Sequence, residues 1–287
     1  MSDGSAMAGR IVVVTGGTSG IGRAAAREIG RQGATVALVA RDRARAEETA
    51  AEVTKGGAPA RIFVADLGVQ AEVRRVAAEL RDALPRIDVL LNNAGVVNLR
   101  YGTTGDGIET TLAVNHLAYF MLTLLLLDSL RAAPAPRIVN VASEAHRWGR
   151  LDFDDLGNAK RYRAMRVYGQ SKLCNILFTY ELARRLRGAP TTANCLHPGA
   201  VATRLGQNNG RIATALTKML GPFFRTPEQG ADTAVYLATS PQVAGASGQY
   251  FANRRAIRSS AISYDERVQR RLWEESERLT GVRWSGS

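Results

Sequence analysis

Short runs of apolar, mostly β-branched residues alternate along the chain with longer segments that mix apolar and polar positions. Such runs are typical of strands that are buried on both faces of a parallel sheet. They predict strands at residues 10–15, 35–40, 61–66, 87–91, 137–143 and 192–196, with a short further strand at 248–251. The remaining segments predict helices at residues 23–29, 43–54, 69–84, 108–130, 167–187, 227–239 and 265–279. This alternation implies an α/β fold with a parallel, doubly wound sheet.

The first predicted strand leads into a glycine-rich loop with the spacing G-x-x-x-G-x-G, and a predicted helix follows the loop. Glycines in this setting let the backbone approach a pyrophosphate, while the helix N-terminus offers amide donors and a partial positive charge. We therefore expect a single Rossmann-type domain with a mainly parallel central sheet and helices on both faces. The loop residues expected to contact a dinucleotide are Gly16, Thr18, Ser19, Gly20, Ile21 and Gly22.

The end of the second predicted strand bears on the choice between NAD and NADP. An NAD site needs an acidic side chain here for the ribose hydroxyls, whereas an NADP site needs a cation for the 2′-phosphate. The strand ends in Ala40 and Arg41, so we expect NADP(H), with Arg41 on the 2′-phosphate and Arg23 as a second candidate. Asp42 keeps NAD open as the alternative, although a short acidic side chain also suits the N-cap of the next helix.

Polar side chains lie where several other predicted strands end. Asp66 and Asn93 follow the third and fourth strands, and Ser143 ends the fifth. Ligands of doubly wound sheets bind beyond the carboxyl ends of the strands. We therefore expect these three side chains to face one ligand site.

Tyr168 and Lys172 are four residues apart on a predicted helix, which puts both side chains on the same face, one turn apart. A free phenol has a pKa near ~10 and is a poor acid or base at neutral pH. A neighbouring ammonium is expected to lower the pKa of the phenol toward the working pH, where proton transfer is efficient. The pair is therefore a candidate proton donor and acceptor, although the same spacing also occurs on plain surface helices.

Taken in order, these motifs resemble the short-chain dehydrogenase/reductase family across nearly the whole chain. The matching residues are Thr15, Gly16, Gly20, Gly22, Asp66, Leu67, Asn92, Asn93, Ala94, Gly95, Asn115, Ser143, Tyr168, Lys172, Pro198 and Gly199. Segments 114–117, 141–146, 171–178 and 248–251 resemble the retinol dehydrogenase-like branch more closely, and the insertion before Tyr168 fits that branch too. The apolar N-terminal anchor of its membrane-bound members has no counterpart in this sequence, which argues against a retinoid substrate.

The resemblance implies an NADP(H)-dependent oxidoreductase that transfers hydride between the nicotinamide and a carbonyl compound or an alcohol. It also implies a catalytic tetrad. In this scheme Ser143 holds the substrate oxygen and Tyr168 is the general acid or base. Lys172 lowers the pKa of Tyr168 and binds the nicotinamide ribose, while Asn115 orders a water that links Lys172 to solvent. The other cofactor contacts that the family implies are Asp66, Leu67, Asn93, Ala94, Gly95, Pro198, Gly199, Val201 and Thr203.

Residues 205–225 carry apolar side chains four apart among small and basic residues, which predicts an amphipathic helix. Because this region covers the substrate in the family, we interpret it as an apolar lid with Phe223 as a substrate contact. An apolar lid in turn predicts a bulky hydrophobic substrate. A helix at a membrane surface is the alternative. His146 is a further candidate for substrate contact, whereas His197 is expected to have a packing or backbone-bonding role.

The charge of the chain adds one question about partners. Its 287 residues have a formal net charge of +12, carried mostly by arginines that are scattered over many segments. This charge raises nucleic acids, membrane surfaces and anionic small molecules as partners, but no basic run is interleaved with aromatic residues. We therefore expect a solvated basic surface and a small hydrophobic carbonyl or alcohol as the partner, with no nucleic acid.

The sequence shows no internal repeat and no linker, so we expect one domain over residues 10–287, after a flexible N-terminus at residues 1–9. The cysteines and histidines lack metal-site spacing, so no metal is expected. No signal peptide and no membrane-spanning apolar run is present, which favours a cytoplasmic enzyme. The alternatives are an NAD-dependent alcohol dehydrogenase and a regulatory protein that binds NADP(H) without chemistry. Apolar helix faces around residues 122–127 and 173–182 are candidates for pairing in a homodimer or homotetramer.

Overall fold

The computed structural model describes residues 6–200 and 225–286 of the chain. Within them, eight strands form one sheet in the order β3-β2-β1-β4-β5-β6-β7-β8. The strands are β1 (Ile11–Thr15), β2 (Thr35–Ala40), β3 (Ala60–Val64), β4 (Val89–Asn92), β5 (Arg137–Val141), β6 (Thr192–Leu196), β7 (Tyr250–Ala252) and β8 (Arg255–Ile257). Neighbouring strands pair in parallel, except that β8 pairs antiparallel with β7. The predicted α/β fold is confirmed.

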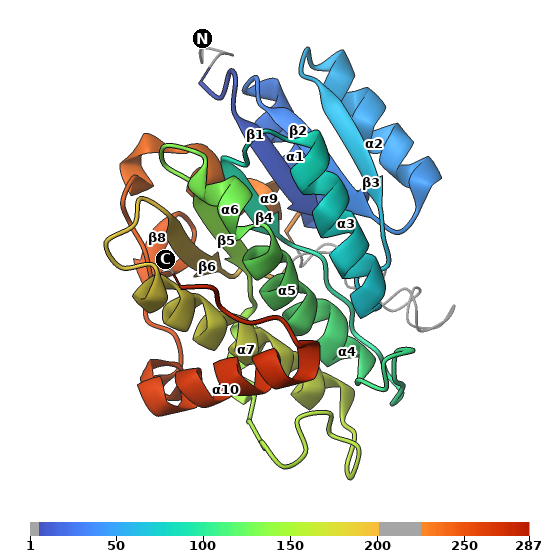
Figure 1. Cartoon of the computed structure of the whole chain (residues 1–287), viewed down its shortest axis with the longest axis vertical. Helices are drawn as coiled ribbons and strands as arrows, with labels where there is room; N and C mark the ends of the chain where they lie inside the picture. Colours follow the sequence, from blue (N-terminus) through green and yellow to red (C-terminus); the bar gives the residue numbers. More distant parts are fainter. Residues whose placement is uncertain (1–5, 201–224, 287) are drawn as a thin grey trace.

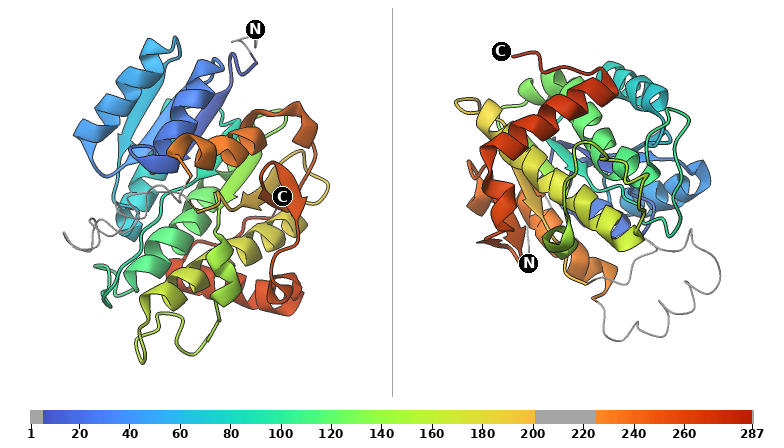
Figure 2. Two further views of the ribbon diagram at one scale, coloured as in Figure 1. Left: turned by 180° about the vertical axis from the view of Figure 1, so that it is seen from behind. Right: turned by 90° about the horizontal axis from the view of Figure 1, so that it is seen from below.

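Helices cover both faces of the sheet (Figures 1 and 2). The longer ones are α1 (Gly20–Arg31), α2 (Arg43–Lys55), α3 (Gln70–Ala83), α5 (Ala118–Leu125), α7 (Ala164–Arg185), α9 (Pro227–Thr239) and α10 (Glu266–Thr280). Successive side chains of a strand point to opposite faces. Val12 therefore packs with α1 and α9, whereas Val13 packs with α3, α5 and α7. Burial on both sides explains why the strands appear in the sequence as continuous apolar runs.

The order of the strands creates a crevice at one edge of the sheet. The chain moves outward from β1 to β3, returns to the centre at β4 and continues outward on the other side to β7. The loop after β1 enters α1 on one face, and the loop after β4 leads to helices on the opposite face. Such a switch point leaves room for a ligand between the two loops.

Three elements differ from the sequence-based prediction. The helix predicted at 108–130 is divided into α4 (Thr110–Leu112), a π-helical turn η1 (Ala113–Leu117), α5 and α6 (Leu127–Arg131). Strand β8 was not predicted, because it has only three residues and all of them are exposed. Met7, in the segment predicted to be flexible, is buried, and its amide donates to the Gln32 carbonyl at 2.8 Å.

The C-terminal helix α10 lies along α7, as Figure 1 shows. Trp273 of α10 stacks on Phe178 with 5.8 Å between ring centroids, and Leu272 joins a buried cluster with Leu173 and Leu177. The apolar face at residues 173–182, a candidate for pairing between subunits, is therefore covered within the same chain. The face at residues 122–127 is likewise largely buried in the core.

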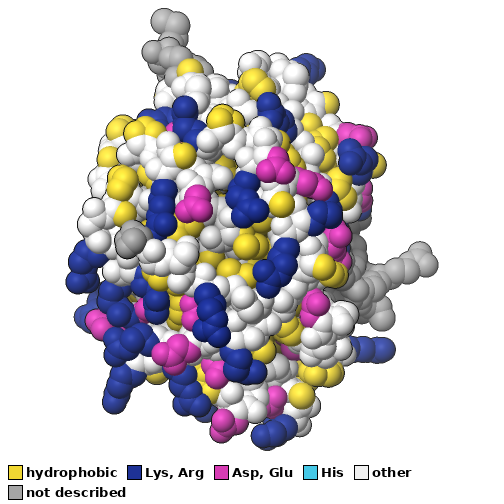
Figure 3. All heavy atoms as spheres, viewed as in Figure 1, with side chains coloured by type: hydrophobic (Ala, Val, Ile, Leu, Met, Phe, Trp, Pro, Cys, Tyr) yellow, Lys and Arg dark blue, Asp and Glu magenta, His cyan; other side chains and the backbone are white. Residues whose placement is uncertain are grey.

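The basic residues are spread over the surface. On the face shown in Figure 3, lysine and arginine side chains lie among acidic, apolar and neutral ones. Toward the start of α10, Arg270 bonds Glu266 at 3.1 Å, and Arg185 of α7 bonds the buried Glu181 at 2.6 Å. This distribution agrees with a solvated basic surface. Among the described residues, no helix combines the length and the hydropathy that crossing a bilayer requires.

Candidate active site

A cavity of about 480 Å³ lies in the crevice at the carboxyl edge of the sheet. Most residues that the sequence predicts to contact a dinucleotide line this cavity. They are Gly16, Thr18, Ser19, Gly20, Ile21, Gly22, Arg41, Asp66, Leu67, Asn93, Ala94, Gly95, Tyr168, Lys172 and Pro198. Val201, Thr203, Phe223 and lid residues 205–224 lie outside the described residues.

The glycine loop after β1 is packed too tightly for larger side chains. A Cβ atom on Gly22 would lie 2.3 Å from the Gly16 carbonyl oxygen and 2.4 Å from Asn93 Nδ2. Asn93 Nδ2 donates to the Thr15 carbonyl at 2.9 Å and so ties the end of β4 to this loop. The N-cap residue Ser19 makes no side-chain bond to the first turn of α1. The first amides of α1 are therefore open to an anionic ligand in the cavity.

Two cations line the cavity between β2 and α2: Arg41, which follows β2, and Arg45, in the first turn of α2. Asp42 lies between them and caps α2 by accepting from the Arg45 amide at 3.1 Å, as expected for an N-cap. Arg45 was not predicted. Its signal in the sequence is a first helical turn without acids and with two arginines, a pattern that the helix dipole disfavours unless an anion binds there.

Arg23, the second candidate for the phosphate, is engaged elsewhere. Its guanidinium binds the Glu52 carboxylate of α2, with Nε 3.0 Å from Oε2. Arg23 does not line the cavity, because α1 directs its side chain toward α2. The prediction for Arg23 is therefore wrong.

The region where β5 and α7 approach each other brings together Tyr168, Lys172 and Ser143. Lys172 is only 3% exposed, and its Nζ donates to the Val141 carbonyl at 2.9 Å. The same Nζ lies 5.7 Å from the centroid of the Tyr168 ring. Ser143 caps the short helix η2 (Glu144–Trp148) by accepting from the Ala145 amide at 3.2 Å. Its hydroxyl proton is therefore left for another acceptor.

The pKa values of this pair differ from the expectation. Burial raises the pKa of Tyr168 to about 12, and the hydrogen bond with Ser143 offsets only part of that rise. Burial lowers the pKa of Lys172 to about 7, because the cavity wall desolvates its ammonium form. At neutral pH the amine is charged only in part. In the protein without a ligand, Lys172 therefore does not bring the pKa of Tyr168 below its ordinary value, contrary to the prediction.

Asn115 lies in the π-helical turn η1 and connects two walls of the site. Its Oδ1 accepts from the Val96 amide at 2.7 Å, and its Nδ2 donates to the Val96 carbonyl and to Ser171 Oγ, both at 3.0 Å. Ser171 Oγ in turn donates to the Tyr168 carbonyl at 2.8 Å. Asn115 thus fixes the segment after β4 against the helix that carries Tyr168.

Comparison with known proteins agrees with this arrangement. The family model described as short chain dehydrogenase matches residues 10–212. The chain belongs to the short-chain dehydrogenases.

Two curated relatives and one solved structure extend the match. Retinol dehydrogenase 14 from Mus musculus is 43% identical over 295 residues, which cover 98% of this chain and 88% of that protein. The "Putative daunorubicin C-13 ketoreductase DnrU" from Streptomyces sp. strain C5 is 42% identical and covers 95% of this chain and 93% of its own. The structure "Pseudomonas aeruginosa RhlG/NADP active-site complex" has a TM-score of 0.70 and 29% identity, and covers 88% of this chain and 97% of that one.

In this short-chain dehydrogenase, two glycines bring Ser143 and Tyr168 together. A Cβ atom on Gly169, the residue after Tyr168, would lie 2.6 Å from the Ala145 carbonyl oxygen of η2. A Cβ atom on Gly149 would lie 2.5 Å from the Gly169 carbonyl oxygen. Both are needed for the close approach of η2 to α7. Sequence reasoning missed them because the contacts join segments about twenty residues apart.

The two histidines near the site contact other protein groups rather than the cavity. His146 is 1% exposed and does not line the cavity, so its predicted contact with substrate is wrong. His197 accepts from the Gly199 amide at 3.1 Å and stacks on Tyr250, which confirms the packing and backbone-bonding role. Gly199 does not line the cavity either, although its φ of +83° shapes the turn after Pro198.

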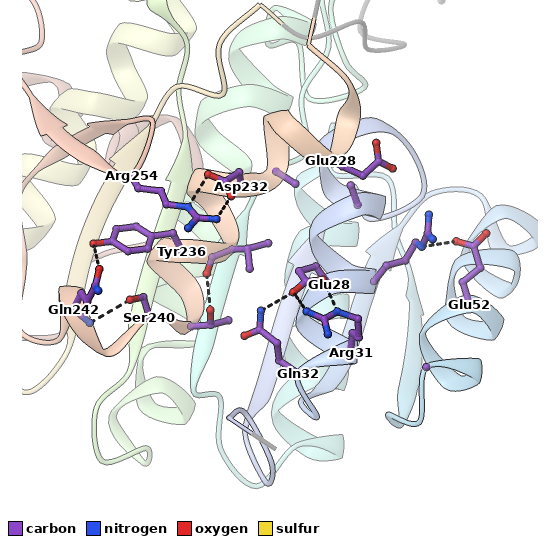
Figure 4. A pocket seen from close by; sticks show the side chains of 16 residues that line it. Glu28, Arg31, Gln32, Glu52, Glu228, Asp232, Tyr236, Ser240, Gln242 and Arg254 are labelled. Atoms are coloured by element: carbon purple, nitrogen blue, oxygen red, sulfur yellow. Dashed lines mark hydrogen bonds and ion pairs between the residues drawn. The ribbon is translucent and has the colours of Figure 1, made fainter. Parts of the chain in front are cut away.

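A larger cavity of about 660 Å³ lies between α1 and α9 on another face of this short-chain dehydrogenase (Figure 4). Much of its charge is paired internally. Arg31 Nε donates to Glu28 at 2.8 Å, and Arg254 Nε donates to Asp232 at 2.7 Å. It has no counterpart of the Tyr168–Lys172 pair or the glycine loop among its lining residues. We therefore place the chemistry in the crevice.

Proposed function

We propose that this protein is an NADP(H)-dependent oxidoreductase that transfers hydride between the nicotinamide and a bulky hydrophobic carbonyl compound or alcohol. The observation that carries this proposal is the convergence of the glycine loop, Arg41, Arg45, Tyr168 and Lys172 on one cavity. The printed names of the relatives refer to a retinol dehydrogenase and a ketoreductase, and RhlG is described in complex with NADP. Family membership supports the oxidoreductase class, and the arginines support NADP(H).

The residues present fit a phosphorylated dinucleotide. The first turn of α1, whose N-cap makes no side-chain bond to it, would receive the pyrophosphate. Arg41 and Arg45 would receive the 2′-phosphate, because charge-assisted hydrogen bonds to phosphate are strong. Asp42 already uses its carboxylate to cap α2, which leaves it less suited to the ribose hydroxyls of NAD.

When bound, the nicotinamide supplies a hydride for carbonyl reduction or accepts one in alcohol oxidation. Ser143 donates its hydroxyl proton to the substrate oxygen, and a donor of this kind contributes on the order of 3 kcal/mol. Tyr168 gives its proton to that oxygen as the carbonyl becomes an alcohol, and takes a proton back in oxidation. Such proton transfer contributes ~10²- to 10⁴-fold.

Lys172 and Asn115 support the tyrosine in this scheme. The ammonium form of Lys172 favours the phenolate of Tyr168, and its place beside the cavity suits the nicotinamide ribose. Asn115 holds the walls on either side of these groups. Proton supply through an ordered water near Asn115 stays a proposal.

The bulky hydrophobic substrate and the lid at residues 205–225 are also parts of the proposal. Besides the expected contacts, the residues that line the cavity include Val96, Val114, Val141 and Ala142. These small and β-branched side chains line the same cavity as Tyr168 and support an apolar ligand there.

The experiment is a depletion assay of NADPH and NADH against a panel of hydrophobic aldehydes, ketones and quinones. We expect turnover of several panel members, with NADPH preferred because two arginines would bind its 2′-phosphate. A preference for NADH would favour the NAD-dependent alcohol dehydrogenase, with Asp42 on the ribose. Tight NADPH binding without turnover of any compound of the panel would favour the regulatory protein.

A further inference from the structure

Four side chains that do not line the cavity form a cluster, which we call the Tyr250 cluster: the buried His146 and Tyr250, the partly buried His197 and the exposed Glu144. Tyr250 of β7 is 1% exposed and lies between the two imidazoles. Its ring centroid is 5.1 Å from that of His146, edge to face, and 5.9 Å from that of His197, stacked. The Tyr250 hydroxyl donates to the Glu144 carboxylate at 3.3 Å. The cluster therefore joins the loop after β5, which carries Ser143, to the loop after β6, which carries Pro198.

The hydrogen bonds of His146 determine its tautomer. The Ser260 amide, which can only donate, points at His146 Nε2 from 3.0 Å. Nε2 is therefore an unprotonated acceptor, and the proton of the neutral imidazole lies on Nδ1. From there it is donated to the Ser143 carbonyl at 2.8 Å. Burial keeps His146 neutral by lowering its pKa.

The Ser143 carbonyl thus receives two bonds from the same residue. The His146 amide donates to it at 3.1 Å, in addition to the bond from Nδ1. This pair fixes the peptide plane that follows Ser143, while the Ala145 amide fixes its Oγ. The Ser260 amide lies beyond β8, 114 residues along the chain, and holds the imidazole from behind. His146 therefore fixes the backbone that carries the Ser143 side chain.

His197 fixes the other loop in the same way. Its Nδ1 accepts from the Gly199 amide at 3.1 Å, and its Nε2 lies 3.6 Å from Glu144 Oε2. Pro198, which lies between His197 and Gly199 in the chain, lines the cavity. The two loops are thus held in register through Tyr250 and Glu144.

We propose that His146 is a positioning residue for the reaction: its Nδ1–H orients Ser143 toward the substrate oxygen, and the Tyr250 cluster holds His146 and the Pro198 loop in place. This inference rests on the proposed function, in which Ser143 binds that oxygen. A group displaced by about 1 Å can cost ~10²-fold in rate, so the effect is large enough to measure.

The test compares two substitutions, each of which places a polar group at the position of one of the two imidazole nitrogens. His146→Asn places an amide donor at the position of Nδ1, while His146→Gln extends its carbonyl toward Nε2 and lacks the Nδ1 donor. We expect kcat to fall ~10²-fold in His146→Gln and to stay within about fivefold of wild type in His146→Asn. The dissociation constant of NADPH should change little in either variant, because His146 does not line the cavity. Melting temperatures of both variants provide the control for a general loss of packing.

Equal kcat values for the two variants would overturn the proposal, whether both match wild type or both fall in step with their melting temperatures. A readout without turnover comes from crystal structures of the variants. We expect Ser143 Oγ to move away from the Tyr168 hydroxyl in His146→Gln and to stay in place in His146→Asn; no movement in either would also overturn the proposal. Failure of the proposed function is distinguishable, because it appears as absence of turnover in the wild-type protein.

Discussion

At the scale of single residues, burial acts in opposite directions on the two members of the Tyr168–Lys172 pair. It raises the pKa of the phenol to about 12 and lowers that of the amine to about 7. At neutral pH Tyr168 therefore holds its proton, which is the form that carbonyl reduction requires. Oxidation requires the phenolate, and a positive charge beside Tyr168 would have to lower its pKa first. Without other ligands, the site is thus better prepared to donate a proton than to accept one.

The cofactor preference is also decided by single residues. We expect Arg41→Ala and Arg45→Ala each to weaken NADPH ~10- to 100-fold, because a charge-assisted contact to phosphate is worth roughly 1.5–3 kcal/mol. NADH binding should change only a few-fold. Arg43→Ala is the matched control, since Arg43 starts the same helix and is exposed but does not line the cavity. Equal losses for both nucleotides, measured by fluorescence titration, would contradict the assignment.

At the scale of elements, the site depends on how closely η2 approaches α7. Ser143 caps η2 and Tyr168 lies on α7, so the contact between these two helices sets the spacing of the two hydroxyls. Gly169 permits this contact because it has no Cβ to meet the Ala145 carbonyl. Asn115 and Ser171 hold the opposite side of α7.

Gly169→Ala tests this packing. Alanine is favoured over glycine in a helix by about 1 kcal/mol, so propensity alone predicts stabilisation. We expect the opposite, a loss of roughly 1–3 kcal/mol in the free energy of unfolding, because the new Cβ overlaps backbone. Turnover should fall at least ~10-fold as Ser143 and Tyr168 separate. Gly105→Ala, where nothing lies within 4 Å of an added Cβ, is the control; a Gly169→Ala variant as stable and active as this control would contradict the account.

At the scale of the whole molecule, the C-terminal helix α10 is hydrogen-bonded to the core through a buried histidine. His116 of η1 is 1% exposed, and its Nε2 lies 2.9 Å from Ser276 Oγ of α10. Burial lowers the pKa of His116 to about 4, below its usual 6.5. Between these two values the unfolded chain binds more protons than the folded one, so acid favours unfolding.

This linkage predicts a pH-dependent stability. From the shift of His116 alone, the free energy of unfolding should fall by about 1.5 kcal/mol between pH 6.5 and about pH 5. His116→Gln cannot titrate and should show a correspondingly shallower dependence, whatever its absolute stability. Urea denaturation at several pH values measures both slopes. Identical slopes for wild type and variant would show that His116 is not kept neutral in the folded state.

The sequence predicts what depends on local patterns and misses what depends on distant contacts. The strands, the glycine loop and the Asp42 cap follow from residues close together in the chain, and the structure bears them out. His146 is a prominent residue near Ser143, but its role depends on Ser260, which no local pattern links to it. Gly169 looks like an ordinary helical glycine until Ala145 is placed beside it. The pKa of Tyr168 likewise depends on burial, which the spacing of Tyr168 and Lys172 does not determine.

The central claim is that the Tyr168 hydroxyl transfers the proton, and its removal in Tyr168→Phe is the most direct test. The measurement is the rate of NADPH consumption with the best substrate of the panel, alongside the dissociation constant of NADPH. We predict that turnover falls by at least ~10²-fold, because general acid catalysis is lost, while NADPH binding stays within a few-fold of wild type. A variant that keeps a tenth of the wild-type rate would show that Tyr168 is not the acid or base.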